Sequence, residues 1–598
     1  MTLSPRRQTA LYAALLFAAG LLYRATFLGQ AFNASDEAFL PALASRVLGG
    51  QVVYRDFIYA SPPLTVFKEA GIAAILGSNY DYLTSRWVFA IEVSIGSVLA
   101  FLIIRRYTPP LVAFLATLPT IFFTTVLYAY SNFNFDAQLL FLIGFLLLVW
   151  EGERERRLLI VLAGVLCGMA FLAKPTYLAM AVGICGLGIL RPWMGGPRRW
   201  PYFAAGFAVM VGLVFAGIWA AGLWADFRQQ AFGLLLSAGP RSTRFYLIQD
   251  WPIYLTPPGT SALPVLAAAI LLVLARMRTW AALPATVLLA ALLAILVVPA
   301  LPSSTVGSPT NPQRYLLVGG LALILAINLV ASAVTLAARL PNLADEPWAV
   351  RVREELFPPF VPIVAAVLEY LHGVDLSTMR FAYVGTFLGI PVALSFLYVG
   401  WRLWNGAAVI RVAAPVVVGA FLVVGGAVIT HGSPYNDGPR SQLIAAFNAP
   451  KLAGITTLPA NAQHVDALVA QIELDTQPNA PVFVFPDGQA YYTLTGRTNP
   501  TKLDWYNLLA TTPAMSAEAV GALKLNPPQF VFVQAYRESD ILQRCPLLPD
   551  LFAQAKVHHI NCPHAFDREP VWRPIYAFIV ANYDVVGTAD GVRVYRLK

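Results

Sequence analysis

The stretch that decides the fold is residues 33–64, NASDEAFLPALASRVLGGQVVYRDFIYASPPL. It is polar, acidic and rich in turn-forming residues, whereas the chain around it is mostly apolar. Asp36 and Glu37 stand near its start, directly after the first long apolar run, and Asp56 and Pro62-Pro63 follow later. Carboxylates in a connection too long for a simple turn indicate a segment with a purpose beyond linking two helices.

The composition is that of a polytopic membrane protein. Of the 598 residues, 58% are hydrophobic and 12% are charged, which is about half the charged share of an ordinary soluble domain. Long apolar runs recur along the chain, and runs of this kind cross lipid as helices. The net charge of +9 comes with many Arg and Lys residues beside apolar runs, as the positive-inside rule predicts. We therefore expect a lipid bilayer, and no nucleic acid, as a partner.

Apolar runs and flanking charges predict the topology. The predicted spans are 9–28, 87–104, 111–127, 137–150, 158–173, 177–190, 202–224, one ending at Arg276 and Arg278, one ending near 299, then 315–338, 381–400 and 409–429. The arginines at 6–7 and 105–106 and the run EGERERR place the N-terminus in the cytoplasm. The weaker run 357–371 is ambiguous. Counting it gives about thirteen helices and an extracytoplasmic C-terminus, whereas omitting it contradicts the charge rule.

The tail changes character after residue 430. Strand-like runs occur at 481–485, 529–533, 583–587 and 592–597, and the last two are joined through ADG as in a hairpin. We expect residues 1–430 to form a transmembrane domain, with 31–85 as its first outer loop, and 431–598 to form a small extracytoplasmic α/β domain. Cys545 and Cys562 can form a disulfide if the tail lies outside the cytoplasm. Cys167 and Cys185 lie in apolar runs and are interpreted as packing residues.

Asp36 and Glu37 allow two interpretations. Ser35 or Asp36 can cap a helix that starts near Glu37, and acidic residues are favourable in a first helical turn. Alternatively, a carboxylate at a membrane surface can act in catalysis. Spacing alone does not separate the two, because a carboxylate at a helix start suits both.

The order of several motifs adds a family resemblance. An acidic pair after the first span, G-x-x-x-Y-R-D-F at 50–57, S-P-P-L at 61–64, LYAYSNFNFDAQ at 127–138 and GVLCGMAFLAKPTY at 164–177 follow one another. This layout resembles GT-C glycosyltransferases, in particular the branch of protein O-mannosyltransferases and lipid A aminoarabinose transferases. The resemblance implies an all-α GT-C membrane fold in a bacterial inner membrane. It also implies transfer of a sugar from a polyprenyl-phosphate donor to a glycolipid, polysaccharide or protein acceptor.

The resemblance assigns roles to the acidic residues. Asp36 would be the general base that takes the proton of the acceptor hydroxyl. Glu37 would orient Asp36 or bind the acceptor or a metal. Asp136 matches a second acidic position at the outer start of the fourth span, where an N-cap is the alternative. Aminoarabinose transferases carry Glu-Lys before the Pro pair, but this chain has Ala60-Ser61. Asp56 is only a conjectural substitute, so no metal is predicted and the cofactor stays unknown.

The donor phosphate requires cations. By the predicted topology Lys174 lies at the outer face, where a positive charge breaks the positive-inside bias and needs an anionic partner. Arg314 follows the same logic, and Arg241 and Arg244 form a pair in an outer loop. Snorkelling or attraction to anionic headgroups are the alternatives. Tyr59 and Tyr128 are candidate substrate contacts, with an interfacial aromatic belt as the alternative.

Two other classes of protein remain open. A transporter or flippase would carry charges at mid-membrane in broken helices. The apolar runs contain few charges, Arg24 and Glu92 among them, whereas most charges gather at the predicted outer face, which favours an interfacial enzyme. In a membrane-anchored binding protein, the tail would be the active part.

Overall fold

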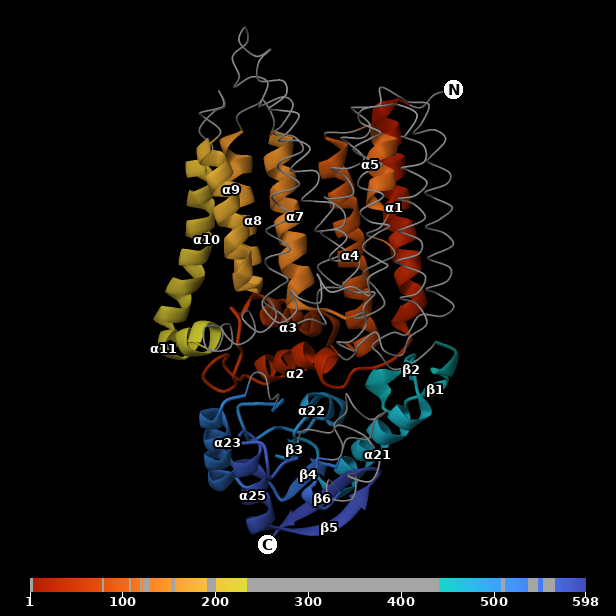
Figure 1. Ribbon diagram of the computed structural model, residues 1–598, viewed down its shortest axis with the longest axis vertical. Coiled ribbons are helices and arrows are strands. Elements are labelled where there is room, and N and C mark those ends of the chain that lie inside the picture. Colours follow the sequence, from red (N-terminus) through yellow and green to blue (C-terminus); the bar gives the residue numbers. More distant parts are fainter. Residues whose placement is uncertain are drawn as a thin grey trace, which may run out of the picture.

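The membrane part of the structure is a bundle of apolar helices. The computed structural model describes residues 4–77, 80–106, 109–118, 121, 130–151, 156–190, 200–233, 440–506, 511–535, 547–551 and 565–598. In these ranges four helices are long and apolar enough to cross a membrane: α1 (Pro5–Leu28), α4 (Tyr82–Arg105), α7 (Phe133–Glu151) and α10 (Trp200–Ala220). At 1.5 Å per residue, helices of this length extend roughly 30 Å, the thickness of a bilayer's hydrocarbon core. Beside them lie α5 (Pro110–Thr117), α8 (Arg157–Ala173) and α9 (Leu178–Leu190) (Figure 1).

The predicted spans agree with these helices as far as the structure describes them. The runs 9–28, 87–104, 137–150, 158–173, 177–190 and 202–224 are all helical, and 111–127 is described only in part. The helices alternate in direction, so the arginines at the start of α1, the end of α4 and the start of α8 share one end of the bundle (Figure 1). The later spans, including 357–371, lie outside the described residues, so the total of about thirteen stays a prediction.

Small residues let two of these helices touch. A Cβ on Gly164 of α8 would come within 2.1 Å of the Phe203 carbonyl oxygen, and a Cβ on Gly206 of α10 within 2.1 Å of the Val161 carbonyl oxygen. Neither site accepts any larger side chain without moving a backbone. Close approach through small residues is how helices associate in lipid, where the hydrophobic effect provides no drive between them.

The loop between the first two long helices is an ordered layer across the other end of the bundle. It contains α2 (Asp36–Leu48) and α3 (Leu64–Leu76), which lie crosswise beneath the bundle in Figure 1, near α11 (Trp224–Phe227) and the π-helical turn η4 (Arg228–Gly233). Leu48, Phe67 and Ile75 leave half or more of their surface exposed. Exposed apolar side chains on helices at a bundle end are expected where a layer lies at a membrane surface.

The C-terminal region, residues 440–598, contains a mixed sheet with helices. Strands β3 (Phe483–Phe485), β4 (Phe530–Gln534), β5 (Tyr583–Ala589) and β6 (Val592–Leu597) are arranged in the order β3-β4-β6-β5, with β3 and β4 parallel and the other pairs antiparallel. All four predicted strands are confirmed, including the hairpin, whose Asp590 and Gly591 both have positive φ. The further elements of this region are α21 (Pro459–Asp475), α22 (Gln489–Thr495), α23 (Pro513–Leu525), α25 (Arg573–Asn582), the β1–β2 pair (Ala445–Ala446, Thr456–Thr457) and the 3-10 turns Arg440–Gln442 and Pro450–Leu452. One more 3-10 turn, Pro175–Tyr177, joins α8 and α9 in the bundle.

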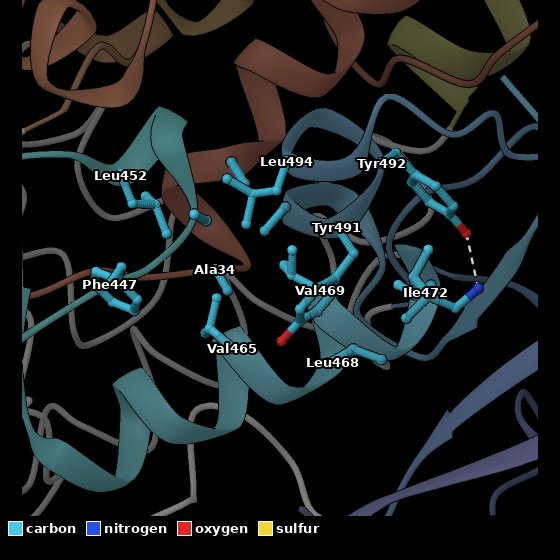
Figure 2. Packing of buried hydrophobic residues seen from close by; sticks show 14 of the residues in the cluster. Ala34, Phe447, Leu452, Val465, Leu468, Val469, Ile472, Tyr491, Tyr492 and Leu494 are labelled. Carbon is cyan, nitrogen blue, oxygen red and sulfur yellow. Dashed lines mark hydrogen bonds between the residues drawn. The ribbon is translucent and has the colours of Figure 1, made fainter. Parts of the chain in front are cut away.

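Both faces of this sheet are covered, and one of them is covered partly by the loop layer. Alternate strand residues point to opposite faces, so Val482 and Val484 enter one core while Phe483 and Phe485 enter the other. The first core also takes Ala34 from the loop layer, which lies among residues of α21 and α22 (Figure 2). The boundary between 430 and 431 stays a prediction, but the two parts share a hydrophobic core.

A buried histidine makes the C-terminal region sensitive to pH. Burial lowers the pKa of His464 in α21, although its Nδ1 lies 2.8 Å from the Asp590 carbonyl oxygen in the hairpin turn. Because this pKa is depressed in the folded state, the stabilising contribution is complete above the unfolded value of about 6.5. It is lost as pH falls through the folded pKa, because the unfolded chain then binds more protons.

We therefore expect acidification below about pH 6.5 to destabilise α21 and the β5–β6 hairpin. Hydrogen exchange of residues 459–475 in the intact protein should accelerate more steeply with falling pH than in the variant His464→Asn, which keeps a donor and cannot titrate. Equal pH slopes in the two proteins would contradict this account of His464.

Candidate functional site

A buried ion pair fixes the start of the loop layer. Arg86, in the first turns of α4, is fully buried and donates to both carboxylate oxygens of Glu37 at 2.6 and 2.8 Å. Its remaining donors reach the carbonyl oxygens of Leu28, Gln30 and Ala31 at 2.6, 3.1 and 2.6 Å. All five guanidinium N–H groups are thus used, and buried charges are tolerated only when satisfied in this way. Glu37 therefore joins α2 to the end of α1 and to α4.

Asp36 is the first residue of α2 and is half-buried. The N-cap position is Ser35, but its side chain makes no capping hydrogen bond. Instead, Asn33 Oδ1 accepts from the backbone N–H groups of Ser35 and Asp36, at 3.0 and 2.9 Å, and from the Ser35 hydroxyl at 2.9 Å. The side chain that caps the start of α2 is therefore that of Asn33, whereas the sequence predicted Ser35 or Asp36 for this role.

A second charged cluster centres on Lys68 of α3. Its Nζ donates to Glu92 of α4 at 3.0 Å, to Ser131 at 3.1 Å and to Asp136 of α7 at 2.5 Å. Burial alone would lower the pKa of Lys68, but the carboxylates of Asp136, Glu92 and Glu69 raise it above its ordinary value. Lys68 therefore keeps its positive charge at neutral pH and fixes α3 to two bundle helices.

Several polar atoms around Lys68 are buried without a hydrogen-bond partner. Glu69 Oε1 accepts from the hydroxyls of Tyr80 and Ser85. In the described part of the chain, Glu69 Oε2, Asp136 Oδ2 and the Tyr59 hydroxyl are buried and make no hydrogen bond. Buried polar atoms without partners are costly and are concentrated at sites that serve a purpose other than stability.

Lys174 reaches the same turn of α7 from the end of α8. It is buried, its Nζ donates to Asn134 Oδ1 at 2.5 Å, and it lies 5.6 Å from the centre of the Phe133 ring. The first turn of α7, residues 133–136, therefore brings together Lys174, Lys68 and Asp136. Lys174 and Asp136 were predicted site residues, whereas Lys68 and Asn134 were not.

The remaining predicted residues make other contacts or are not described. Asp56 makes a local turn: it accepts from the Val52 N–H at 2.8 Å and pairs with Arg55 at 2.9 Å. The hydrogen bond from Arg55 holds the pKa of Asp56 below its usual range. Tyr59 is buried and its backbone N–H donates to Gln230 Oε1 at 3.1 Å. Arg241, Arg244, Arg314, Tyr128, Cys545 and Cys562 lie outside the described residues.

Sequence reasoning overlooked two cations for which the sequence carried a signal. Arg86 stands at the outer end of the second predicted span, so it breaks the positive-inside bias as Lys174 does. Glu92 lies inside that span and therefore requires a cation nearby, which Lys68 provides. Within the described ranges, no group of three or more His, Cys, Asp or Glu residues is arranged to hold a metal ion.

Part of the chain matches a protein-family model, and the structure has similar solved structures. The profile of a family described as a domain of unknown function (DUF6311) matches residues 16–237. No curated protein matches the sequence. The structure is similar to the oligosaccharyltransferase of Archaeoglobus fulgidus in complex with zinc and sulfate, at 12% identity and a TM-score of 0.47, covering 88% of this chain and 68% of that one.

Two further solved structures are similar to the chain. The same archaeal enzyme, AglB, in complex with an inhibitory peptide and a dolichol-phosphate has 13% identity and a TM-score of 0.44, covering 88% of this chain and 69% of that one. ArnT from Cupriavidus metallidurans in the apo state has 12% identity and a TM-score of 0.41, covering 98% and 97%.

The Glu37–Arg86 pair can be tested by a double-mutant cycle. Arg86→Met leaves the Glu37 carboxylate buried without a cation, so we expect it to lower the free energy of unfolding by about 3–5 kcal/mol. Adding Glu37→Leu should recover part of that loss, because the uncompensated charge is then removed.

Thermal or denaturant unfolding of the purified protein measures both effects. Lys502→Met is the matched control, because it breaks the exposed Lys502–Glu518 pair, whose value is about 1 kcal/mol or less. A loss for Arg86→Met no larger than that of the control would show that the buried pair does not hold the loop.

Proposed function

We propose that this chain is a GT-C-type glycosyltransferase that moves a sugar from a polyprenyl-phosphate donor to an acceptor hydroxyl or phosphate, with Asp36 as general base. One observation carries the proposal. The acidic first turn of α2 lies at the same end of the helix bundle as Lys174, which is buried, and Lys68, which is partly buried; both cations contact the first turn of α7 (Figure 1). A base and a phosphate-binding cation are the two parts that such a transfer needs.

The chemistry follows from these parts. As an acceptor oxygen attacks the anomeric carbon, its bond to that carbon forms and its proton passes to the Asp36 carboxylate. The bond from the anomeric carbon to the phosphate oxygen breaks, and the polyprenyl phosphate leaves with the electron pair. Phosphate is a good leaving group, so cations that stabilise its charge replace a general acid. Lys174 is proposed for this task, with Arg241, Arg244 and Arg314 as further donor-phosphate ligands.

The remaining residues have supporting tasks in this proposal. Glu37, committed to Arg86, orients the turn that carries Asp36 and does not itself take the proton. Asp136, Tyr59 and Tyr128 line the substrate site, and Asp56 stays a proposed contact at its edge. No metal ion is proposed. The acceptor is a glycolipid, a polysaccharide or a protein.

Charge supports the orientation of the site. The bundle end opposite the loop layer carries the arginines at 6–7, 105–106 and 156–157, and such an excess favours the cytoplasmic side. The loop layer and the C-terminal region then lie outside the cytoplasm, at the outer face of a bacterial inner membrane. A polyprenyl-phosphate sugar presents its headgroup at that surface.

A transporter or flippase is the second candidate, and one observation favours it. Glu92 lies inside the span α4 and pairs with Lys68, and buried ionisable networks in membrane helices often serve transport. The two candidates differ in outcome: a transporter moves its substrate across the bilayer unchanged, whereas a transferase breaks the sugar–phosphate bond.

The catalytic proposal is tested with Asp36→Asn, which keeps the size of the side chain and removes the base. In cells that lack the gene, the lipid-linked sugar donor should accumulate, and the wild-type gene should clear it. Asp36→Asn should lower the rate of clearance by at least about 100-fold, because general-base catalysis contributes that much. Mass spectrometry of extracted carrier lipids gives both the identity of the donor and the rate.

Asp226→Asn, in the first turn of α11 at the same end of the bundle, is the matched control and should clear the donor normally. Normal clearance by Asp36→Asn would remove Asp36 from the mechanism. Absence of any accumulated lipid-linked sugar in the deletion strain would contradict the transferase proposal as a whole.

The donor-phosphate role is tested with Lys174→Ala. Loss of one charge-assisted hydrogen bond costs about 1.5–3 kcal/mol, so the donor concentration needed for half-maximal transfer should rise roughly 10- to 100-fold. The measurement uses purified protein and the donor identified above. Lys524→Ala, an exposed lysine of α23, should leave that concentration unchanged. An unchanged donor dependence for Lys174→Ala would instead support snorkelling.

A further inference from the structure

The peptide unit that precedes Asp36 is held from two directions. Its N–H, which belongs to Asp36, donates to Asn33 Oδ1 at 2.9 Å. Its C=O, which belongs to Ser35, accepts from Gln489 Nε2 at 3.1 Å. Asn33 lies three residues earlier in the loop layer, whereas Gln489 is the first residue of α22 in the C-terminal region. Both polar groups of a single peptide plane are therefore fixed, one by each part of the protein.

Gln489 is buried in a helix that packs directly against the loop layer. Its side chain is fully buried, and its Oε1 makes no hydrogen bond in the described part of the chain. The neighbouring residues of α22, Tyr491 and Leu494, pack with Ala34 in the shared hydrophobic core (Figure 2). The hydroxyls of Tyr82 and Thr493 lie 2.6 Å apart, which adds a polar contact between α4 and α22.

A second contact fixes the other end of α2 to the same region. Arg46 donates to both carboxylate oxygens of Asp504, at 2.5 and 3.0 Å, and to the Thr501 carbonyl oxygen at 2.9 Å. Both side chains are more than nine-tenths buried. Because other contacts already hold α2 near both ends, the Gln489 hydrogen bond is not needed to place the helix as a whole. It restrains one peptide plane, that between Ser35 and Asp36.

We infer that Gln489 is a positioning residue for Asp36, so that the C-terminal region completes the catalytic geometry of the membrane part. The inference rests on the proposed function. If the Ser35–Asp36 peptide plane is released, the backbone angles of residues 35 and 36 can change and the first residue of α2 can leave its helical position. The Asp36 side chain then moves with it. Gln489 and Asn33 oppose that change together. A misplacement of the order of 1 Å at a catalytic group lowers rates by about 100-fold.

The test compares three variants of the full-length protein. Gln489→Leu keeps the volume and removes the donor, so kcat for sugar transfer should fall roughly 10- to 100-fold while the half-saturating donor concentration stays the same. Gln489→Glu donates to the Ser35 carbonyl only when protonated, so its activity relative to wild type should fall as pH rises. Gln471→Leu is the matched control, because the Gln471 amide bonds Asp475 within its own helix, α21.

Hydrogen exchange supplies a readout that does not depend on transfer. Amides of residues 35–40 should exchange faster in Gln489→Leu than in wild type and in Gln471→Leu, while the unfolding temperature changes little. Unchanged exchange in that segment, or full kcat in Gln489→Leu, would overturn the inference. If no protein in the set transfers sugar, the proposed function fails, and the exchange experiment still decides whether Gln489 holds the Asp36 turn.

Discussion

The structure depends on the buried contact between Glu37 and Arg86. Two charges removed from water are costly, and the cost is offset only when every donor and acceptor finds a partner. Here the Arg86 guanidinium serves three carbonyl oxygens as well as the carboxylate. Those carbonyls belong to the last residue of α1 and to the chain that follows it. A single side chain therefore connects the end of the first span and the start of the loop layer to α4. Ala31, which has a φ of 58°, is held in its left-handed conformation by the same contact.

The Lys68 cluster shows why the loop layer cannot be treated as a surface connection. A lysine and three carboxylates meet where α3, α4 and α7 come together. Glu69 and Asp136 are buried and Lys68 and Glu92 are partly buried, so the cluster has more negative than positive groups. Stability alone would favour apolar residues at such a junction, because replacing buried ion pairs by well-packed hydrophobic groups is often neutral or stabilising. The cluster therefore supports the view that this end of the bundle is built for polar chemistry, whether it binds a phosphate-linked sugar or transports a substrate.

Hydropathy predicted the described spans well, but it missed the first turns of α4 and α7, which carry the charged and polar residues of the site. The predicted second span starts at 87, whereas α4 starts at Tyr82, capped by Asp81, and the missed turn contains Arg86. Likewise, the predicted fourth span starts at 137, whereas α7 starts at Phe133 and its first turn contains Asn134 and Asp136. Polar residues at a helix start lower the local hydropathy, so a method that seeks apolar runs excludes them. The strands were easier to predict, because short β-branched and aromatic runs between turn residues identify them locally. The partners of Arg86, Lys68 and Gln489 lie from tens to hundreds of residues away, and no local pattern predicts such pairs.

The loop layer is held by both the bundle and the C-terminal region along its length. Glu37 is bound by Arg86 of the bundle, Arg46 binds Asp504 of the C-terminal region, the Ile58 N–H donates to the Lys502 carbonyl oxygen, and the Tyr59 N–H donates to Gln230. Because the layer is anchored to both parts, it cannot move with one of them without breaking contacts to the other. Most loops combine function with mobility. In this protein, the strongest contacts of the layer are ion pairs, whose attraction changes little when the partners shift slightly. The Ser35–Asp36 peptide is instead held by two directional hydrogen bonds, from Gln489 and to Asn33. A small displacement between the bundle and the C-terminal region would therefore strain this peptide, which on the inference above positions Asp36.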